Sequence, residues 1–327
     1  MNSTASIAVS IVIPVFNEEE SVATLCQKLH DATSKLGRSY EIILVDDGSR
    51  DSTWERLREQ AQKLPHLRLI RFRRNFGQTA AMSAGFDAAR GEVIITLDAD
   101  LQNDPADFPL LLERMDAGCD VVSGWRKNRQ DTFINRRLPS VIANWLIGRI
   151  TGVRLHDYGC TLKAYRREVM QGVRLYGEMH RFIPALASWV GGRIEEVVVN
   201  HHARQFGTTK YGIGRTFRVV LDLFTVKFLL HYSTRPIQIF GRVGLYFLAA
   251  ALLMLGWVGI DRLFITHSLA DSFLLKRPFW IITPLMFIGF ALQFISMGLL
   301  AEVQVRTYHE SQHKPIYVIR ETCSSPA

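Results

Sequence analysis

Two aspartates one residue apart, Asp98 and Asp100, directly follow an apolar run at residues 93–97. Such a run is typical of a buried strand, and two carboxylates this close repel one another unless a cation lies between them. Carboxylate oxygens, together with the side-chain amide of Gln102, are the hard ligands that Mg²⁺ and Mn²⁺ prefer. A turn is the alternative role for such residues, so the spacing alone leaves a metal site and a structural turn equally open.

The elements that must position these residues alternate between strand and helix over the first 130 residues. Repeated strand–helix–strand units imply a mostly parallel sheet with helices on both faces, and therefore an α/β fold. The last helix begins at Asp104-Pro105, which is a typical helix start. Apolar runs predict strands at 10–16, 41–47, 66–72, 92–98 and 120–123, and helical spacing predicts helices at 18–36, 52–64, 78–89 and 105–117.

Polar residues follow four of these predicted strands. In an open α/β sheet, ligands bind beyond the carboxyl ends of the strands. One acidic strand end is an ordinary turn, but four that meet at one edge predict a binding site. The chain has no Gly-x-Gly-x-x-Gly and no Gly-x-x-x-x-Gly-Lys-Ser/Thr motif, which disfavours a Rossmann dehydrogenase and a P-loop NTPase. The strand ends carry Asn17 and Glu18, Asp46 and Asp47, Arg74 and Asn75, and Asp98 and Asp100.

The composition favours a membrane-associated protein of a reducing compartment. The chain has 327 residues, a net charge of +8 and 48% hydrophobic residues, which is high for a wholly soluble protein. Its four cysteines are scattered and form no Cys-x-x-Cys pair, so neither a zinc site nor a disulfide framework is indicated. The N-terminus lacks the basic region of a signal peptide.

Two long apolar stretches near the C-terminus predict membrane spans. Residues 243–260 and 279–301 carry no charge, and each stretch can cross a hydrocarbon core of about 30 Å. Six lysines and arginines but one acid lie at 204–235, against three basic residues between the two stretches. By the positive-inside rule the N-terminal domain is therefore cytoplasmic. This basic segment adjoins a predicted span, which favours anionic lipid over nucleic acid as its partner.

Longer motifs carry a family resemblance. The segments SIVIPVFNEEESV, VDDGSRDST, RRNFGQTAAMSAGF and ITLDADLQNDP, in this order, resemble the family 2 inverting glycosyltransferases with a GT-A fold. GWRKNRQDTFINRRLPS, HDYGCTLKAYRREV, HRFIPALA, FGTTKYGIGR and the C-terminal MGLLAEVQVRTYHESQHKPIYVIRE resemble the polyprenyl-phosphate glycosyltransferases of that family. Within it, the pattern is most similar to undecaprenyl-phosphate formamido-arabinose transferases and O-antigen bactoprenol glucosyltransferases, and more distantly similar to dolichyl-phosphate mannose synthase. The resemblance covers nearly the whole chain. It implies inverting transfer of a sugar from a nucleotide-sugar, UDP-linked in the most similar groups, to undecaprenyl or a similar polyprenyl phosphate.

The resemblance also assigns a donor site. It gives a divalent cation, Mg²⁺ or Mn²⁺, to Asp98, Asp100 and Gln102, where the cation would grip the donor diphosphate. The alternatives are a turn-forming role for Asp47, a helix start at Gly77, and lipid-facing charge at Arg204 and Lys210, which match a loop that closes over the diphosphate. The full donor set is Pro14, Phe16, Asn17, Glu18, Asp46, Asp47, Gly77, Gln78, Asp98, Ala99, Arg204 and Lys210.

The acceptor implied by the resemblance needs cationic guidance. The second pKa of a phosphate monoester is about 6, so the nucleophile is already a dianion at neutral pH and needs no general base. Planar guanidinium groups suit a phosphate, although a solvated basic face is the alternative for any single arginine. The acceptor set is Arg126, Arg129, Arg136, Arg137 and Ser140, in which Arg136 and Ser140 match the family's phosphate-binding Arg-x-x-x-Ser.

Asp157 matches an active-site carboxylate of the family and is expected to position the donor sugar rather than to take a proton. Its neighbour His156 is assigned no role. A structural cap is the alternative for Asp157. The predicted catalytic residues are therefore Asp100, Asp157, Arg126 and Arg136.

The predicted organisation is a GT-A domain at 1–210, a juxtamembrane amphipathic helix at 211–235, two membrane helices at about 237–260 and 279–301 within residues 236–302, and a cytoplasmic tail at 303–327. An amphipathic helix at 138–150 is expected near the membrane surface in preference to the core. The resemblance adds the bacterial inner membrane and a homo-oligomer such as a tetramer. The alternatives are a processive polysaccharide synthase of the same fold, whose Gln-x-x-Arg-Trp motif is missing here, and a non-catalytic sugar-lipid translocase or scaffold, for which two spans make a poor conduit.

Overall fold

The computed structural model describes residues 7–127, 138–203, 222–228 and 315–324, together with scattered positions between 246 and 311. The chain divides into two compact units. One comprises Met1–Val226 and Pro315–Ala327, and the other comprises Lys227–Lys314. The first unit contains the sheet and all of the candidate site residues, so the fold below is that of this unit.

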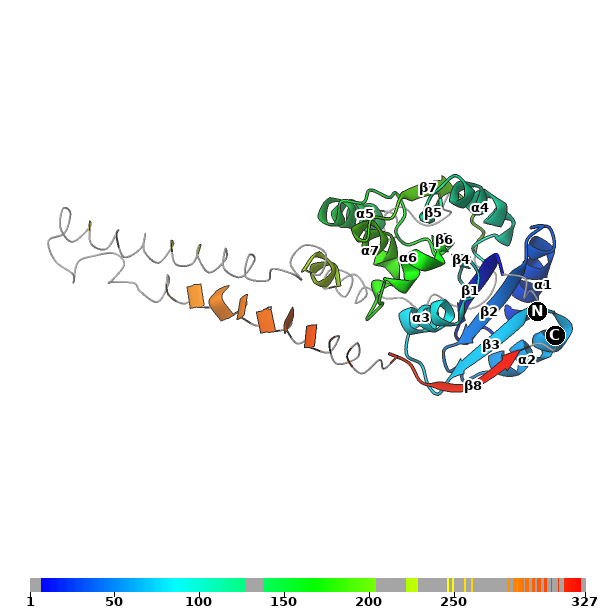
Figure 1. The fold of residues 1–327 in the computed structure, drawn as a ribbon. Coiled ribbons are helices and arrows are strands. Elements are labelled where there is room, and N and C mark those ends of the chain that lie inside the picture. The colour runs from blue at the N-terminus through cyan, green and yellow to red at the C-terminus, as the bar shows by residue number, and fades with distance from the viewer. Residues whose placement is uncertain are drawn as a thin grey trace. The chain divides into compact units, whose positions relative to one another are not determined.

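An eight-stranded sheet organises the first unit, in the order β7-β5-β6-β4-β1-β2-β3-β8 (Figure 1). β6 is antiparallel to both β4 and β5, and β8 is antiparallel to β3, whereas the other pairs are parallel. The mostly parallel α/β architecture predicted from the sequence is therefore confirmed. The strands are β1 (Val9–Val15), β2 (Tyr40–Asp46), β3 (Leu67–Phe72), β4 (Val93–Thr96), β5 (Val121–Trp125), β6 (Lys163–Arg166), β7 (Ile194–Val198) and β8 (Ile319–Ser324).

Helices connect the strands and cover both faces of the sheet. The side chains of Ile11 and Ile13 join one core with residues of α1, α2 and α4, while Val12 packs on the opposite face against Gly85 of α3. The helical elements are α1 (Val22–Thr33), α2 (Thr53–Lys63), α3 (Gln78–Ala88), the 3-10 turn η1 (Pro105–Asp107), α4 (Phe108–Asp116), α5 (Leu138–Thr151), α6 (Arg167–Gln171), the 3-10 turn η3 (Met179–Phe182) and α7 (Ile183–Trp189).

The five strands and four helices predicted for the first 130 residues are all present, with ends that differ by a few residues. The predicted helix start at Asp104 is confirmed, because its side chain accepts a hydrogen bond of 3.0 Å from the N–H of Ala106. The first turn there is a 3-10 turn rather than an α-helix. β6, β7 and β8 were not predicted, because each is short and carries charged residues that break the apolar pattern.

The C-terminal segment, which lies within the predicted tail at 303–327, contributes a strand to the sheet. β8 lies along the edge of β3, with Leu69 opposite Cys323. Just before it, the ring of Tyr317 stacks on Phe72, with centroids 5.1 Å apart and planes 12° apart. The Tyr317 hydroxyl donates to a carboxylate oxygen of Asp87 at 2.9 Å. Residues 319–324 therefore complete the sheet that begins at residue 9.

Of the predicted membrane segments at 237–260 and 279–301, the structure describes only scattered positions, and those positions are helical. Of the helices described, none combines the length and the apolar character needed to cross a membrane. The predicted helix at 211–235 is described at 222–228, which is helical, with Leu223 and Val226 buried and Phe224 60% exposed. On α5, Ile147 is buried whereas Trp145 is 64% exposed, so this helix contributes to the core and also presents an aromatic side chain at the surface.

Candidate functional site

The candidate site lies at the carboxyl ends of the central parallel strands. β1 pairs with β2 on one side and with β4 on the other. The chain therefore builds the sheet outward from β1 in one direction through β2 and β3, and then crosses to the other side of β1 to add β4. A crevice at such a switch point is the usual ligand site of an open α/β sheet. The residues after β1, β2, β3 and β4 therefore share one edge, as the sequence predicted, and β6 and β5 extend this edge on the β4 side.

The loops after β1 and β2 are bonded to each other. The N–H of Asn17 donates to Oγ of Ser49 at 2.9 Å, and Oδ1 of Asn17 accepts from the N–H of Arg50 at 2.9 Å. The N–H of Glu18 donates to Oγ1 of Thr53 at 2.9 Å. Asn17 has a φ of 51°, a left-handed conformation that asparagine tolerates. These bonds hold Asn17 and Glu18, together with the partly buried Pro14 and Phe16, in one rim.

Asp46 and Asp47 are both buried at the end of β2, but they make different contacts. Oδ1 of Asp46 accepts from the N–H of Ser49 at 3.0 Å, and its Oδ2 lies 3.3 Å from Nε of Arg71. Asp47 accepts from the side chain of Asn75 at 2.9 Å and from the N–H groups of Phe76 and Gly77 at 2.7 and 2.9 Å. Burial raises the pKa of Asp47 to about 6, although these backbone N–H groups oppose the rise.

Asp47 therefore fixes the loop that leads into α3, where Gly77 is the residue before the helix and Gln78 is its first residue. This contact supports the structural alternative for Asp47 and leaves its predicted place in the donor site untested. Gln78 in turn donates to Oδ1 of Asp98 at 2.7 Å. The loops after β2, β3 and β4 are thus joined through Asp47 and Gln78.

The turn after β4 holds the three predicted metal ligands. Oδ1 of Asp100 accepts from the N–H of Gln102 at 3.2 Å. Between them, Leu101 is buried and has a φ of 61°, which is unusual for a branched apolar residue and is the kind of local strain found at functional sites. Ala99 is also buried, while Asp98, Asp100 and Gln102 are partly exposed. Because Ala99 and Leu101 point into the core, the alternating side chains of Asp98, Asp100 and Gln102 lie at the surface of the sheet edge.

This donor set fits a hard divalent cation bound together with a substrate. In the part of the chain that the structure describes, no three His, Cys, Asp or Glu side chains gather as a complete metal-binding group. Two carboxylates and an amide from one turn leave coordination positions for diphosphate oxygens and water, as Mg²⁺ commonly requires.

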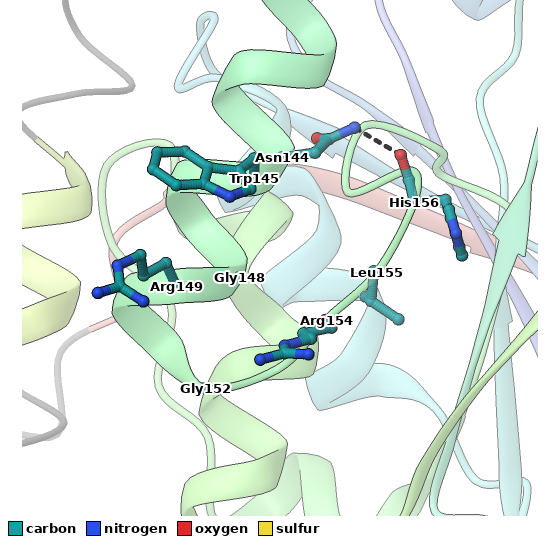
Figure 2. Close-up of a pocket in the computed structure, with 8 residues that line it drawn as sticks. All are labelled: Asn144, Trp145, Gly148, Arg149, Gly152, Arg154, Leu155 and His156. Carbon is teal, nitrogen blue, oxygen red and sulfur yellow. Dashed lines mark hydrogen bonds between the residues drawn. The ribbon is translucent and has the colours of Figure 1, made fainter.

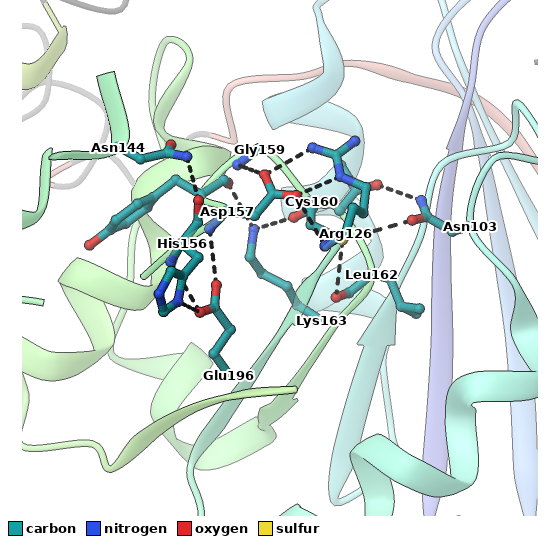
Figure 3. Close-up of polar contacts among 12 residues, drawn as sticks. Asn103, Arg126, Asn144, His156, Asp157, Gly159, Cys160, Leu162, Lys163 and Glu196 are labelled. Atoms are coloured by element: carbon teal, nitrogen blue, oxygen red, sulfur yellow. Dashed lines mark hydrogen bonds and ion pairs between the residues drawn. The ribbon is translucent and has the colours of Figure 1, made fainter. Parts of the chain in front are cut away.

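Arg126 and Asp157 form a buried ion pair beside this turn (Figure 3). Nε of Arg126 donates to Oδ2 of Asp157 at 2.7 Å, and Nη2 donates to Oδ1 at 3.0 Å. The side chains are only 13% and 4% exposed. Burial lowers the pKa of Arg126, but the hydrogen bond and charge of Asp157, with a smaller contribution from Asp98, raise it overall above its ordinary value. The arginine is therefore a permanent cation that interacts electrostatically with both Asp157 and Asp98.

Three residues that the sequence analysis did not single out support Asp157. Glu196 of β7 accepts from the N–H of Asp157 at 3.0 Å and contacts Nδ1 of His156 at 2.7 Å. The ring of His156 stacks on Trp125, with centroids 4.1 Å apart. His156, which was assigned no role, thus helps to hold the loop that carries Asp157.

Lys163 supports the same loop from below. Its ammonium group is buried and donates to the backbone carbonyls of Tyr158, at 3.2 Å, and Cys160. Burial lowers its pKa. The signal in the sequence was a lysine in the middle of the apolar run "CTLKAY", because a cation there needs internal partners.

The side chains of six predicted site residues are not described by the structure. Ser140 lies in the first turn of α5, but its side chain is not described. The other five are outside the described residues and stay predictions: Arg129, Arg136, Arg137, Arg204 and Lys210.

The sequence profile of glycosyl transferase family 2 matches residues 10–174, which contain both acidic loops and the Arg126–Asp157 pair. The chain belongs to this family. It is therefore a glycosyltransferase, as the resemblance implied. It is 45% identical over 323 residues to the dodecaprenyl-phosphate galacturonate synthase of Rhizobium johnstonii, covering 97% of this chain and 93% of the relative. It is 40% identical over 320 residues to the undecaprenyl-phosphate 4-deoxy-4-formamido-L-arabinose transferase of Pectobacterium atrosepticum, with coverage of 97% and 94%.

Solved structures with the same fold include glucosyl-3-phosphoglycerate synthase of Mycobacterium tuberculosis in complex with Mn²⁺ and UDP-glucose. The TM-score is 0.53 at 15% identity, and the match covers 69% of this chain and 79% of that one. At this identity the likeness concerns the fold alone. It confirms the GT-A-like α/β architecture of the catalytic domain.

Proposed function

We propose that this glycosyltransferase transfers a sugar from a nucleotide-sugar, UDP-linked, to a polyprenyl phosphate such as undecaprenyl phosphate. One observation supports the proposal most directly. The acidic turn after β4, which is suited to a metal ion bound to a diphosphate, and the buried Arg126, which is suited to a phosphate, lie at the same edge of the sheet. Two relatives that act on polyprenyl phosphates match the chain over nearly its full length. A processive synthase or a non-catalytic translocase has no comparable support.

The donor diphosphate would bind at the turn after β4. Asp98, Asp100 and Gln102 would hold Mg²⁺ or Mn²⁺ there, and the cation would supply charge neutralisation for the departing nucleoside diphosphate. Gln78 keeps Asp98 oriented through its 2.7 Å hydrogen bond. The rim of Asn17 and Glu18 lies at the same sheet edge, directly after β1, and is the proposed wall of the nucleotide pocket.

The acceptor phosphate would bind at the same sheet edge, on the β5 side. A phosphate oxygen attacks the anomeric carbon, the bond from that carbon to the diphosphate oxygen breaks, and the electron pair leaves with the nucleoside diphosphate. Because the acceptor is a dianion, no proton is transferred, and attack opposite the leaving group inverts the anomeric centre. Arg126 attracts and orients the phosphate, while Asp157 holds Arg126 and positions the sugar. An aspartate engaged twice by one guanidinium is poorly suited to act as a base.

The enzyme is proposed to work at the cytoplasmic face of the bacterial inner membrane, with two spans at about 237–260 and 279–301 and as a homo-oligomer. The apolar stretches and their charge flanks support this arrangement. Alkaline phosphatase fused within residues 262–277 gives a direct test, since it is active only after export. An inactive fusion with normal expression would contradict the two-span topology.

A transfer assay tests the reaction. The purified full-length protein in detergent is given undecaprenyl phosphate, Mn²⁺ or Mg²⁺, and a panel of radiolabelled UDP- and GDP-sugars, with EDTA as the metal-free condition. Label is expected in the lipid phase, from one donor and only with metal. Donor hydrolysis without lipid labelling would show that undecaprenyl phosphate is not the acceptor. Lipid labelling in EDTA would show that transfer does not require a divalent cation.

Asp100→Ala is expected to abolish transfer without changing membrane insertion or thermal unfolding. Asp116→Ala, which removes an exposed carboxylate from α4, is the matched control and is expected to retain full activity. Mn²⁺ binding followed by electron paramagnetic resonance separates the two variants independently of turnover. Full activity of Asp100→Ala would show that Asp100 has no role in the reaction.

A further inference from the structure

A basic pocket lies at the C-terminal end of α5, on residues that no step of the proposed reaction uses. Its volume is about 530 Å³, and Trp145, Arg149, Arg154 and His156 are among the side chains that line it (Figure 2). Trp145 and Arg149 are one helical turn apart on α5, while Arg154 and His156 come from the loop that follows.

The backbone is shaped to bring these side chains together. Gly152 has a φ of 81°, which reverses the chain at the end of α5. A side chain at Gly148 would place its Cβ 3.1 Å from the carbonyl oxygen of Val153, so this glycine lets the returning loop lie against the helix. The loop therefore runs back along α5 and carries Arg154 to the same side as Arg149.

Hydrogen bonds hold the loop in this position. The side chain of Asn144 donates to the carbonyl of His156 at 2.6 Å (Figure 2). The hydroxyl of Tyr158 donates to the carbonyl of Val153 at 2.6 Å. The pocket is thus fixed at both ends of the loop, and its basic side chains need little reorganisation to meet a ligand.

The charges in the pocket are arranged for an anion. Arg149 and Arg154 are exposed, and neither forms an ion pair with any residue that the structure describes. Glu196, an acid that contacts this loop, is bonded to Nδ1 and to the N–H of His156. Two guanidinium groups on adjacent elements suit a phosphate, which they can contact with paired N–H donors.

The exposed tryptophan distinguishes a lipid from a soluble phosphate. Trp145 is 64% exposed at the rim of the pocket. An indole beside arginines is characteristic of side chains that sit at a membrane interface, where the ring enters the acyl boundary and the cations meet head groups. A soluble phosphate would gain nothing from this ring.

We propose that this pocket binds the phosphate of an anionic phospholipid head group, with Trp145 inserted beside it at the membrane surface. The inference rests on the proposed membrane function and adds a second phosphate site to it, separate from the one at Arg126. Because the loop from Arg154 continues directly into Asp157, a bound head group would anchor the segment that carries the acceptor-side ion pair. The catalytic edge would then face the bilayer at a fixed orientation.

Fluorescence quenching in nanodiscs tests the pocket. The full-length protein is reconstituted in phosphatidylcholine with increasing fractions of brominated phosphatidylglycerol, or of brominated phosphatidylcholine. The signal of Trp145 is the difference between the wild type and Trp145→Phe. Each arginine at an anionic surface raises the binding constant roughly fivefold. Brominated phosphatidylglycerol is therefore expected to quench Trp145 at a much lower mole fraction than brominated phosphatidylcholine does.

Arg149→Gln with Arg154→Gln is expected to remove this preference, shifting half-maximal quenching to a phosphatidylglycerol fraction roughly 25-fold higher or beyond the accessible range. Arg56→Gln with Arg58→Gln, two exposed arginines of α2, is the matched control and should leave it unchanged. Equal quenching by both lipids, or an unchanged preference in the pocket variant, would overturn the proposal. Loss of the preference on adding inorganic phosphate would also overturn it, in favour of a soluble-phosphate site.

Sugar transfer measured on the same nanodiscs is a separate readout, so failure of the lipid site is distinguishable from failure of the proposed reaction.

Discussion

Removing Asp157 is expected to destabilise the catalytic domain strongly, because it strands Arg126 as a buried cation. The two side chains are 13% and 4% exposed and are joined by two hydrogen bonds of 2.7 and 3.0 Å. Breaking a buried pair of this kind by deleting one partner costs about 3–5 kcal/mol. For a unit of this size, 1 kcal/mol corresponds to about 2–4 °C in Tm. Asp157→Ala is therefore expected to lower the Tm by about 6–20 °C.

The chain contains a matched control for this experiment. Arg38 and Asp116 are also joined by two hydrogen bonds, from Nη1 and Nη2 at 3.1 and 2.5 Å, but their side chains are 37% and 53% exposed. Solvent screening limits such a pair to about 1 kcal/mol or less, so Asp116→Ala should shift the Tm by less than about 4 °C. Thermal unfolding of both variants in the same detergent compares a buried with an exposed pair, since each aspartate accepts two hydrogen bonds from one guanidinium.

A double substitution tests the same account of the buried pair in a second way. Arg126→Met with Asp157→Leu removes both charges and is expected to unfold at a higher temperature than Asp157→Ala, because no uncompensated charge remains. Transfer should nevertheless be lost, since the acceptor phosphate no longer meets Arg126. Equal shifts for Asp157→Ala and Asp116→Ala, or a double variant less stable than the single one, would refute the account of this pair.

Three further predictions follow from the described contacts. The pKa of Asp47 is raised by burial from its ordinary value of 3.8 to about 6, so the native state binds more protons than the unfolded state between these values, and stability falls as pH rises from about 4 to 6. Asp47→Asn is expected to flatten this dependence in unfolding measured from pH 4 to 7, and an unchanged slope would contradict the assignment. Tyr317→Phe loses only the bond to Asp87 and should cost about 0.5–1.5 kcal/mol, whereas Tyr317→Ala also loses the stack on Phe72 and should cost about 3–5 kcal/mol; equal costs would show that the stack contributes nothing. Lys163→Met leaves two loop carbonyls without their donor, at roughly 1–3 kcal/mol each, and is expected to lower kcat while donor KM stays constant; a change in donor KM alone would contradict a role on the acceptor side.

The sequence predicted the part of the fold in which each element repeats a simple pattern. β1 to β5 are apolar runs separated by helices of regular spacing, and their polar ends identify the edge that carries Asn17, Asp47 and Asp98. The pattern cannot show that β6 inserts antiparallel between β4 and β5, because a four-residue strand with the sequence KAYR has no diagnostic period. That insertion is what carries Lys163 beneath the loop of Asp157.

The support of the site was harder to predict than the site itself. Asp98 and Asp157 stand in recognisable motifs, but Glu196 lies 39 residues after Asp157 and meets it only because β7 pairs with β5. Trp125 likewise reaches His156 through the end of a strand rather than through sequence proximity. Contacts that depend on sheet order therefore appear only in three dimensions.

The position of β8 has a consequence for how the chain is made. The strand it pairs with, β3, ends at residue 72, yet β8 begins at residue 319, so the sheet cannot be completed until residues 319–324 have left the ribosome. During that interval β3 presents an unpaired edge, which is a template for aggregation. A chain shortened before Pro315 would keep that edge permanently and would also lack the aromatic partner of Phe72. Affinity tags and truncations at the C-terminus are thus changes to the catalytic domain, and soluble fragments of this enzyme need β8 supplied as part of the same fold.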